Sequence, residues 1–354
     1  MEKIDVQSEY LFNRLAKRYR HLKKWAGRTG TNAYRLYDRD IPEIPLVLDL
    51  YGDAVSGALY KRPYLKDEQD QGAFIAEEEN LRYTEDWIKA MKASIGRVLE
   101  IPEGKIFLKE RQRMRRRQEE GIQYGRISTL GFYRDVREGD IGYRVNLSDY
   151  LDTGLYLDAR KKRALIRGES AGKKVLNLFA YTCTLSAAAA KGGAKQVDSV
   201  DLSNTYLEWG KINLALNGFS PEITSGNDFA FNSGADTCRL VRSDVLQFLR
   251  NAKNAGAKWD IVILDPPAFS NSKKMRSVLD TRRDHRNLIQ SCLSLLSPGG
   301  TLWFSSNARG FSLEAGDFPG YILKDMRKEL LDEDFRGKTI PLCYTITHNS
   351  REAN

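Results

Sequence analysis

Short apolar runs alternate with helical patterns from about residue 155 onward, and this alternation constrains the fold more than any other feature of the sequence. Strand-like runs occur at residues 175–181, 197–203 and 259–269, at the start of 238–249, and at 301–307 after a Pro-Gly-Gly turn. Strands that alternate with helices build a parallel sheet covered on both faces. We therefore expect a doubly wound α/β domain over residues 155–354, with its ligands beyond the carboxyl ends of the strands.

The positive charge of the chain is concentrated in a few windows. The sequence holds 56 Lys and Arg against 47 Asp and Glu. Residues 14–28 contain seven bases and no acid, and the enrichment recurs at 105–117, 158–167 and 273–286. Such clusters are typical of surfaces that bind RNA or DNA, although solvated helix faces give the same pattern. The bases that we expect to contact RNA are Lys23, Lys24, Arg113, Arg115, Arg116, Arg117, Lys273 and Arg309.

The residues before 155 predict a smaller α+β region that handles the substrate. Apolar spacing predicts amphipathic helices over 9–27 and 84–99, and short apolar pieces broken by Pro and Gly predict a small antiparallel sheet over 32–60. A strand at 106–108 and a hairpin within 122–149 follow. We divide the chain into a basic N-terminal helix, a small α+β RNA-handling domain, a β-hairpin connector and the doubly wound domain, at 1–30, 31–120, 121–154 and 155–354.

Several classes of protein are disfavoured by composition. No apolar run approaches the roughly 20 residues that span a bilayer, and the N-terminus lacks the apolar segment of a signal peptide. The four Cys form no Cys-x-x-Cys pair and the chain has three His, which argues against disulfides and metal centres. We therefore expect a cytoplasmic protein without a metal.

Polar and aromatic residues follow the predicted strands where ligands are expected. The residues concerned are Asn177, Phe179, Tyr181 and Thr182 after the first strand, Asp201 after the second and Asp244 after the third. An acid at the end of the second strand is placed to accept the ribose hydroxyls of a nucleoside cofactor. The absence of a Gly-x-Gly-x-x-Gly loop disfavours a nicotinamide dinucleotide and favours S-adenosylmethionine. Each acid alone is equally compatible with a helix N-cap.

The fourth strand ends in Asp265-Pro266-Pro267-Ala268-Phe269. Consecutive prolines restrict the backbone and present carbonyl groups at a set position. In a methyltransferase such a turn can hold the edge of a flat base near the methyl donor, with Phe269 available for stacking. The simpler alternative is that the two prolines only end a strand.

Motifs along nearly the whole chain resemble one known family. They are LFNRLAKRYRHLKKWAGRTGTNAYRLYDRDIPE at 11–43, YLDTGLYLDAR at 150–160, NLFAYTCTLS at 177–186, VDLSNTYLEWGKINLALNGF at 200–219, LDPPAFSNSKKM at 264–275, RDHRNLI at 283–289 and FSSNARGF at 304–311. The chain is similar to the C-terminal, 7-methylguanosine-forming half of the bifunctional bacterial 23S ribosomal RNA guanine methyltransferase. The N2-methylating half has no counterpart here, so we expect a free-standing form.

The resemblance implies a Rossmann-like class I methyltransferase domain that uses S-adenosylmethionine. It implies that Asp158 and Arg160 line the methionine end of the cofactor, together with the turn that begins at Asn177. By the same resemblance Asp201 binds the ribose, Asp244 lies on the adenine side, and Asp265 contacts both cofactor and target base. The implied partner is 23S ribosomal RNA or an assembling large-subunit particle. Cys183 departs from the family pattern, since related turns usually have Gly there, and we expect a less free backbone at that position.

The chemistry of guanine favours N7 as the methylated atom. Its in-plane lone pair attacks without prior loss of a proton, so the enzyme has to supply approach geometry and desolvation. The guanosine would be unpaired or flipped from its stack. Asn307 and Arg309, beyond the fifth strand, are candidates to hold its edge. Methylation at guanine N2 stays open, because similar Asp-Pro-Pro turns also suit exocyclic amines.

Three other functions compete with guanine methylation. Cytosine C5 methylation needs a thiolate, which related enzymes place after strand five, where this chain reads Phe304-Ser305-Ser306-Asn307. A nicotinamide dehydrogenase would need the missing glycine loop. A non-catalytic RNA-binding protein on a methyltransferase fold would fail to bind S-adenosylmethionine.

Overall fold

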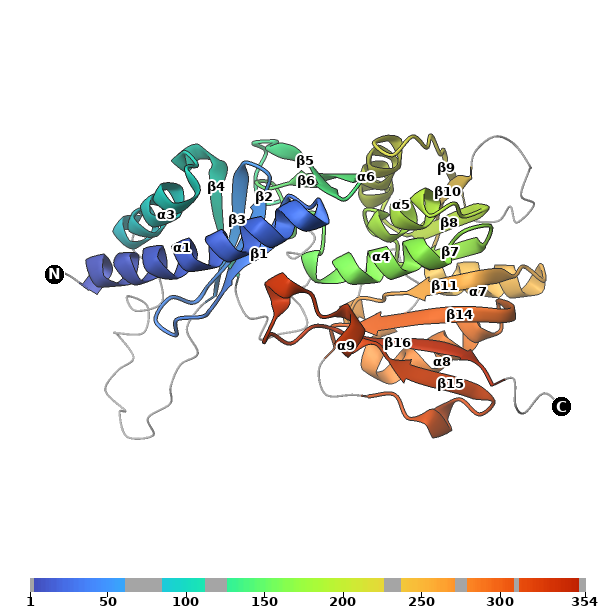
Figure 1. The fold of residues 1–354 in the computed structure, drawn as a ribbon. Helices are drawn as coiled ribbons and strands as arrows, with labels where there is room; N and C mark the ends of the chain where they lie inside the picture. Colours follow the sequence, from blue (N-terminus) through green and yellow to red (C-terminus); the bar gives the residue numbers. More distant parts are fainter. Residues whose placement is uncertain are drawn as a thin grey trace, which may run out of the picture. The chain divides into compact units, whose positions relative to one another are not determined.

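The computed structural model describes residues 3–60, 85–111, 126–225, 237–270, 279–308 and 312–349. The chain forms two compact units (Figure 1). The N-terminal unit comprises Met1–Asp140 and Val145–Thr153, and the C-terminal unit comprises Ile141–Arg144 and Gly154–Asn354. Within the described ranges, no helix combines the length and the apolar character needed to cross a membrane.

The N-terminal unit contains two long helices and a four-stranded sheet. Its elements are α1 (Lys3–Thr29), β1 (Ala33–Asp38), β2 (Leu46–Tyr51), β3 (Ala54–Tyr60), α3 (Glu85–Leu99), the 3-10 helix η1 (Glu103–Lys105) and β4 (Ile106–Arg111). Strands β1, β2 and β3 pair antiparallel, as predicted, and β4 adds to β3 in parallel. Leu11, Leu15 and Leu22 of α1 share one buried core with this sheet and with Met91 of α3. The basic helix is therefore an integral layer of this unit.

A two-stranded sheet follows, formed by β5 (Tyr133–Glu138) and β6 (Ile141–Asn146). The turn between them is the predicted one, and its Gly139 has a φ of 63°, which favours glycine. The division between the two units falls within β6.

The C-terminal unit contains an eight-stranded sheet with helices on both faces (Figure 1). Its elements are η3 (Leu157–Ala159), α4 (Arg160–Glu169), β7 (Lys174–Leu178), α5 (Thr184–Lys191), β8 (Gln196–Asp201), α6 (Asn204–Ala215), β9 (Ile223–Ser225), β10 (Cys238–Arg242), α7 (Val245–Asn254), β11 (Trp259–Leu264), β12 (Phe269–Ser270), β13 (Leu279–Asp280), α8 (Thr281–Leu293), β14 (Leu296–Ser306), η4 (Ala315–Asp317), β15 (Tyr321–Asp325), α9 (Arg327–Leu330), η5 (Glu333–Phe335) and β16 (Leu342–His348).

The order of the large sheet is β15-β16-β14-β11-β7-β8-β10-β9. The strands from β14 to β9 pair in parallel, which confirms the predicted doubly wound architecture. Strand β16 pairs antiparallel with both β14 and β15. This antiparallel edge was not predicted, because the alternation of strands and helices that identified the others ends at β14.

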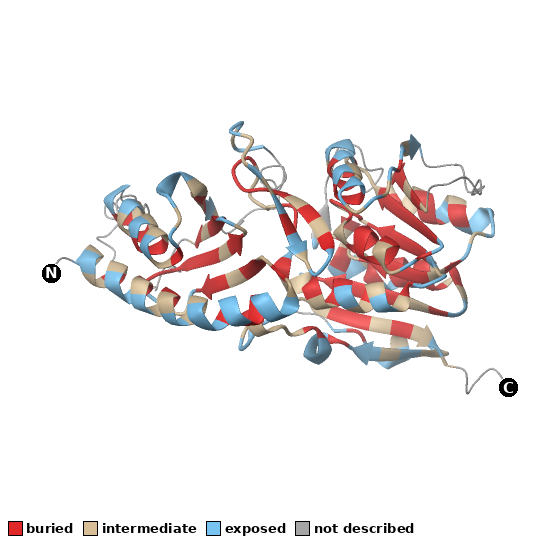
Figure 2. Ribbon diagram, turned by 45° about the horizontal axis from the view of Figure 1, so that its top comes forward, coloured by how far each residue is buried: buried red, intermediate tan, exposed pale blue. Residues whose placement is uncertain are grey.

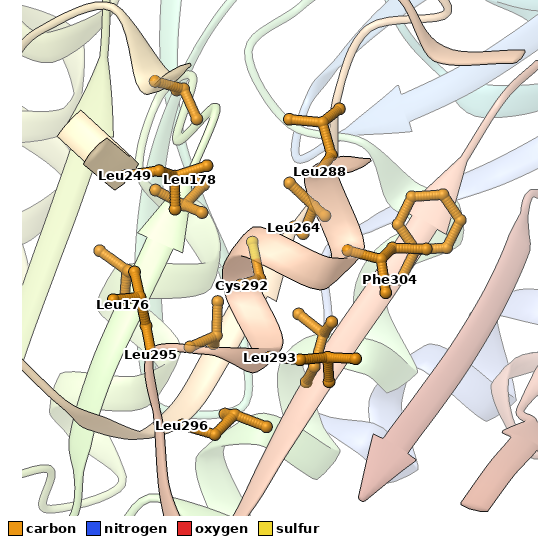
Figure 3. Packing of buried hydrophobic residues seen from close by; sticks show 14 of the residues in the cluster. Leu176, Leu178, Leu249, Leu264, Leu288, Cys292, Leu293, Leu295, Leu296 and Phe304 are labelled. Atoms are coloured by element: carbon orange, nitrogen blue, oxygen red, sulfur yellow. The ribbon is translucent and has the colours of Figure 1, made fainter. Parts of the chain in front are cut away.

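One face of this sheet is covered by α7 and α8 over an apolar core (Figure 3). Leu176, Leu264 and Phe304 come from neighbouring strands, and Leu288 and Cys292 come from α8. Figure 2 shows the parallel strands of this unit as mostly buried. Because both faces of a parallel strand are covered, its sequence is a nearly continuous apolar run. The interpretation of Cys292 as a core residue is confirmed.

The strand order places a topological switch point at β7. The chain moves from β7 to β8 on one side and returns to add β11 on the other. Leu178 of β7 lies opposite Val200 of β8 and Leu264 of β11. The residues that follow these three positions therefore share one edge of the sheet, where ligands of such folds bind.

Candidate functional site: the carboxyl edge of the parallel sheet

The turn between β7 and α5, residues 179–183, has an unusual backbone. Phe179, Tyr181 and Cys183 have φ values of 55°, 51° and 57°, in the left-handed region that side chains with a Cβ rarely adopt. Amide hydrogen bonds hold the turn: Ala180 donates to the Val200 carbonyl (3.0 Å) and Cys183 to the Ala180 carbonyl (2.8 Å). Cys183 thus takes a glycine-like conformation despite its side chain. Such conformations cluster at ligand sites, where the surrounding structure holds them.

Asp201, at the end of β8, anchors this turn with its carboxylate. One oxygen accepts the Tyr181 amide (2.9 Å) and the other accepts the Ser203 amide (2.8 Å). Burial raises the pKa of Asp201 to about 6, although these two bonds and one from the Leu202 amide oppose the shift. The three amide bonds leave one of the roughly four acceptor sites of the carboxylate, so it can also accept a hydroxyl group. The N-cap of α6 is Ser203, whose hydroxyl accepts the Tyr206 amide.

Three tyrosine rings lie in a row at the same turn. The centroids of Tyr156 and Tyr181 are 5.5 Å apart, and those of Tyr181 and Tyr206 are 4.5 Å apart. Tyr156 is 44% exposed, so the row presents an aromatic surface to solvent. Tyr156 and Tyr206 were missed by the sequence analysis, because each falls outside the strand-end positions that it considered.

Asp265 lies directly after β11 and forms an ion pair with Lys162 of α4. The Lys162 ammonium is 3.0 Å from Asp265 Oδ2 and also donates to the hydroxyl of Ser305 near the end of β14. The side chain of Lys162 is 4% exposed and that of Asp265 is 38% exposed. Lys162 was counted in the sequence only as part of a basic window, and no local pattern distinguishes it there from its neighbours.

The two prolines after Asp265 lead into the short strand pair β12–β13. The Thr281 hydroxyl donates to the Pro267 carbonyl (2.7 Å), and the Thr281 amide donates to the Ala268 carbonyl (3.1 Å). Each of these two carbonyls thus accepts a hydrogen bond from Thr281, and the role predicted for the turn at the target base stays a prediction. Thr281, absent from the sequence prediction, holds the turn in place.

Comparisons with known proteins assign the family. The family described as S-adenosylmethionine-dependent methyltransferase matches residues 112–314. The chain belongs to this family. It is 40% identical to "Ribosomal RNA large subunit methyltransferase K" of Neisseria meningitidis, over 96% of this chain and 87% of that protein. It is also 40% identical to "Ribosomal RNA large subunit methyltransferase K/L" of Pseudomonas aeruginosa, of which it spans 42%.

Solved structures show the same fold. The crystal structure of SMU.776, a methyltransferase complexed with SAH, matches 96% of this chain and 81% of its own, with a TM-score of 0.67 and 24% identity. A SAM-dependent methyltransferase from Agrobacterium tumefaciens matches 86% of this methyltransferase chain, with a TM-score of 0.53 and 18% identity. The Rossmann-like class I architecture is thereby confirmed.

The residues of the edge fit S-adenosylmethionine, the cofactor of the family. Asn177 is buried at the end of β7, where its Nδ2 donates to the Ser186 hydroxyl (2.8 Å), but its Oδ1 has no partner within the described part of the chain. Buried acceptors without a donor are rare, and the ammonium of the methionine moiety is a donor of the kind that Oδ1 lacks. Asp201 offers an acceptor for a ribose hydroxyl, as predicted for this position.

Two residues predicted to contact the cofactor, Arg160 and Thr182, have internal partners. The Arg160 guanidinium is buried and bonded to the carboxylates of Asp334 (2.9 and 3.1 Å) and Asp332 (3.0 Å). The Thr182 hydroxyl is also buried and donates to the Gly154 carbonyl. Both side chains point into the protein interior, because the charge and hydroxyl groups find complementary partners there. The cofactor contacts predicted for Arg160 and Thr182 stay predictions.

The remaining predicted site residues take several different places. Asp244 is the N-cap of α7 and accepts the Gln247 amide (2.9 Å), which is the helix-capping alternative stated for each of these acids. Asp158 is half-buried in η3, and Asn307 is exposed just after β14. The backbone of Phe269 lies in β12. No interaction described here assigns these four residues to the cofactor or the base, and their roles stay predictions.

The basic windows differ sharply in exposure. Lys23 and Lys24 are exposed on α1, whereas Lys162 and Arg163 of the 158–167 window are buried. Two of the buried cations have internal partners, Asp265 for Lys162 and the Tyr143 ring for Arg163, while Lys161 and Arg167 are half-buried. Binding of a polyanion by this window stays a prediction. The other predicted RNA contacts lie outside the described residues: Arg113, Arg115, Arg116, Arg117, Lys273 and Arg309.

Proposed function

We propose that this methyltransferase modifies a guanosine of 23S ribosomal RNA, or of an assembling large-subunit particle, at N7. The observation that carries a guanine as the target is the half-exposed Asp265 carboxylate, one strand away from the turn that Asp201 anchors, and the choice of N7 rests on the chemistry of its lone pair. A carboxylate at this position suits the donor edge of a base beside the proposed cofactor position, and this supports the proposal. The relative named for ribosomal RNA, aligned over most of its length, supports the same substrate class. A cytoplasmic location is part of this proposal.

The described groups suit a transfer that needs no general base. Bound S-adenosylmethionine supplies the methyl group, and the lone pair of guanine N7 forms the new bond while the methyl–sulfur bond breaks. The positive charge ends on the guanine ring, and no proton moves in this step. A fixed carboxylate nearby stabilises that charge through preorganised electrostatics. His285 is buried in α8, where its Nδ1 lies 2.9 Å from the Arg282 carbonyl.

Methylation at guanine N2 is the second candidate, and Asp265 is the specific reason to retain it. Attack by an exocyclic amine requires a proton acceptor, and a half-exposed carboxylate can take that proton. Cytosine C5 methylation is disfavoured, because it needs a thiolate. Burial raises the pKa of Cys343, which lies opposite Ser305 on β16, to about 11, and it raises the pKa of Cys183 and Cys292 further.

We further propose that the N-terminal unit handles the RNA through α1. Four exposed cations follow one another at helical spacing along this helix, and we call them the α1 cation row: Lys17, Arg20, Lys24 and Arg28. At about 1.5 Å per residue the row extends for roughly 16 Å, enough to meet several phosphates. Such contacts position the RNA without reading its sequence. The roles predicted for Lys23 and for the bases outside the described residues belong to the same proposal.

The product decides between these candidates. Ribosomal RNA from a strain lacking this protein is incubated with the full chain and methyl-labelled S-adenosylmethionine, and the digested nucleosides are separated by mass spectrometry. We expect label in 7-methylguanosine of the 23S RNA and in no other nucleoside. Label in N2-methylguanosine would support the second candidate, and 5-methylcytidine would contradict both. A protein that binds RNA but transfers no label would be a non-catalytic binder.

A further inference from the structure

We propose that Lys162 is a positioning residue for methyl transfer, and that its buried ammonium fixes the Asp265 carboxylate toward the target base. The inference deepens the proposed function, since it rests on Asp265 as the group that receives the base. It concerns a residue that the family resemblance, the sequence patterns and the comparisons all leave without a role.

The first argument is the energetic cost of placing a lysine there. Lys162 lies in the first turn of α4 and is 3% exposed. Removing an ammonium from water costs several kcal/mol unless paired charges and hydrogen bonds compensate. Its two partners, Asp265 Oδ2 at 3.0 Å and the Ser305 hydroxyl, supply that compensation. A site that needed only packing would be filled more stably by an apolar side chain of the same length.

The second argument is the asymmetry of the pair. The carboxylate is 38% exposed at the side chain, while the lysine is 4% exposed. Asp265 has access to water and does not need the ammonium for its own solvation. The lysine instead constrains the orientation of the carboxylate: Oδ2 is engaged, and Oδ1 has no hydrogen-bond partner among the described residues. One oxygen is therefore held inward and the other is left for a ligand.

The third argument is that Lys162 joins the two strands on which the site depends. Asp265 follows β11 and Ser305 belongs to β14, and these strands pair in parallel with Leu264 opposite Phe304. The lysine crosses from α4 to both of them. Neighbouring cations on α4 are directed elsewhere: Arg160 bonds Asp332 and Asp334, and Lys161 donates to the Leu331 carbonyl (2.7 Å). Lys162 thus differs from its neighbours by facing the strand ends.

The consequence for the reaction follows from orientation. The free oxygen of Asp265 accepts from the donor edge of guanine, and a carboxylate kept in one rotamer holds that edge without sampling other positions. A misplacement of about 1 Å at such a group can cost on the order of 100-fold in rate.

The experiment compares Lys162→Met with the adjacent control Lys161→Met in the full chain. Labelled methyl transfer into total RNA of the deletion strain gives kcat and KM whatever nucleoside is modified, and calorimetry gives the dissociation constant for S-adenosylmethionine. We expect Lys162→Met to lower kcat about 10- to 100-fold, with cofactor binding within about twofold of the wild type. Lys162→Arg should restore part of the loss, and Lys161→Met should leave both quantities unchanged.

A double-mutant cycle with Asp265→Asn separates positioning from simple destabilisation. If Lys162 acts through Asp265, adding Lys162→Met to Asp265→Asn causes little further loss of kcat. Independent losses that multiply, or an unchanged kcat in Lys162→Met, would overturn the proposal. If Lys162→Met does not fold, Lys162→Gln, which keeps a neutral donor, replaces it in the same cycle with the same criteria.

The outcomes for the two proposals remain distinct. An active wild type whose product is not 7-methylguanosine would refute the N7 assignment, while the ratio of variant to wild-type kcat still decides the role of Lys162. A wild type that methylates no RNA at all would overturn both.

Discussion

Lowering the pH from 8 to 5 should weaken the binding of S-adenosylmethionine because Asp201 then gains a proton. Its carboxylate is the acceptor expected for the ribose hydroxyls, and only the ionised form offers both oxygens. Burial raises the pKa of Asp201 to about 6. The ionised fraction is nearly complete at pH 8, one half near pH 6 and about one tenth at pH 5.

The magnitude follows from that titration. If the cofactor binds only the ionised form, the apparent dissociation constant rises about tenfold between pH 8 and pH 5, equivalent to about 1.4 kcal/mol. An aspartate with the usual pKa near 4 would change affinity by less than a factor of about 1.2 over the same interval. The raised pKa also means that protonated Asp201 stabilises the folded, cofactor-free protein below about pH 4. This stabilisation is lost as the pH rises from about 4 to about 6. Protonation of Asp201 at low pH therefore does not unfold the protein, and weaker cofactor binding at pH 5 cannot be attributed to unfolding through this residue.

The assay is isothermal titration calorimetry of S-adenosylmethionine at pH 8, 7, 6 and 5, with circular dichroism to confirm that the chain stays folded. Asp201→Asn should weaken binding at pH 8 about 10-fold or more, because one of its two amide partners then faces an NH₂ group, and it should abolish the pH dependence. Asp260→Asn is the matched control, since Asp260 also accepts a backbone amide, from Lys174, at the start of β7. A dissociation constant that is flat from pH 8 to 5 would refute the reasoning.

Three further predictions concern other parts of the chain. Alanine at all four positions of the α1 cation row should weaken RNA binding, measured by fluorescence anisotropy, and reduce the slope of log affinity against log salt by about 3. The control variant Arg250→Ala with Lys253→Ala on α7 should change this slope little. Leu264→Ala in the core, where Leu264 is 0% exposed, should cost about 2–5 kcal/mol in urea unfolding. Gly210→Ala should weaken cofactor binding, because the added Cβ would lie 2.5 Å from Cys183 Sγ in the cofactor turn. Cys183→Gly in the same chain should restore part of the affinity, and additive losses of affinity would contradict this coupling.

Much of the fold was predictable from local patterns. The parallel strands are continuous apolar runs because both of their faces are covered, and the helices between them show the expected spacing. The position of Asp201 was predictable in the same way, because a residue at the end of a parallel strand lies at the carboxyl edge of the sheet. The β15–β16 pair was not predictable in this way, because a short antiparallel edge has no alternation with helices to identify it.

The candidate site was predictable only in part, and the cations of α4 show why. Arg160, Lys161 and Lys162 are consecutive and equally basic in the sequence, yet they meet an acidic pair, a backbone carbonyl and Asp265 respectively. Successive residues of a helix point in directions about 100° apart, so composition alone gives no basis for choosing among them. The tertiary structure therefore gives these three cations internal contacts that the basic composition of the window does not predict.

The sequence by itself determined the doubly wound sheet, the family and the strand-end positions at which ligands are expected, since each depends on local periodicity or on residues adjacent in the chain. Only the tertiary structure decided which side chains at those positions face the site. Thr281 and Lys162 reach the Asp-Pro-Pro turn from 14 and 103 residues away, and Asn213 donates to the Thr182 carbonyl from 31 residues away. The physical reason is that a buried polar group is placed by the partner that satisfies it, and partners so distant in sequence meet only when the sheet is assembled.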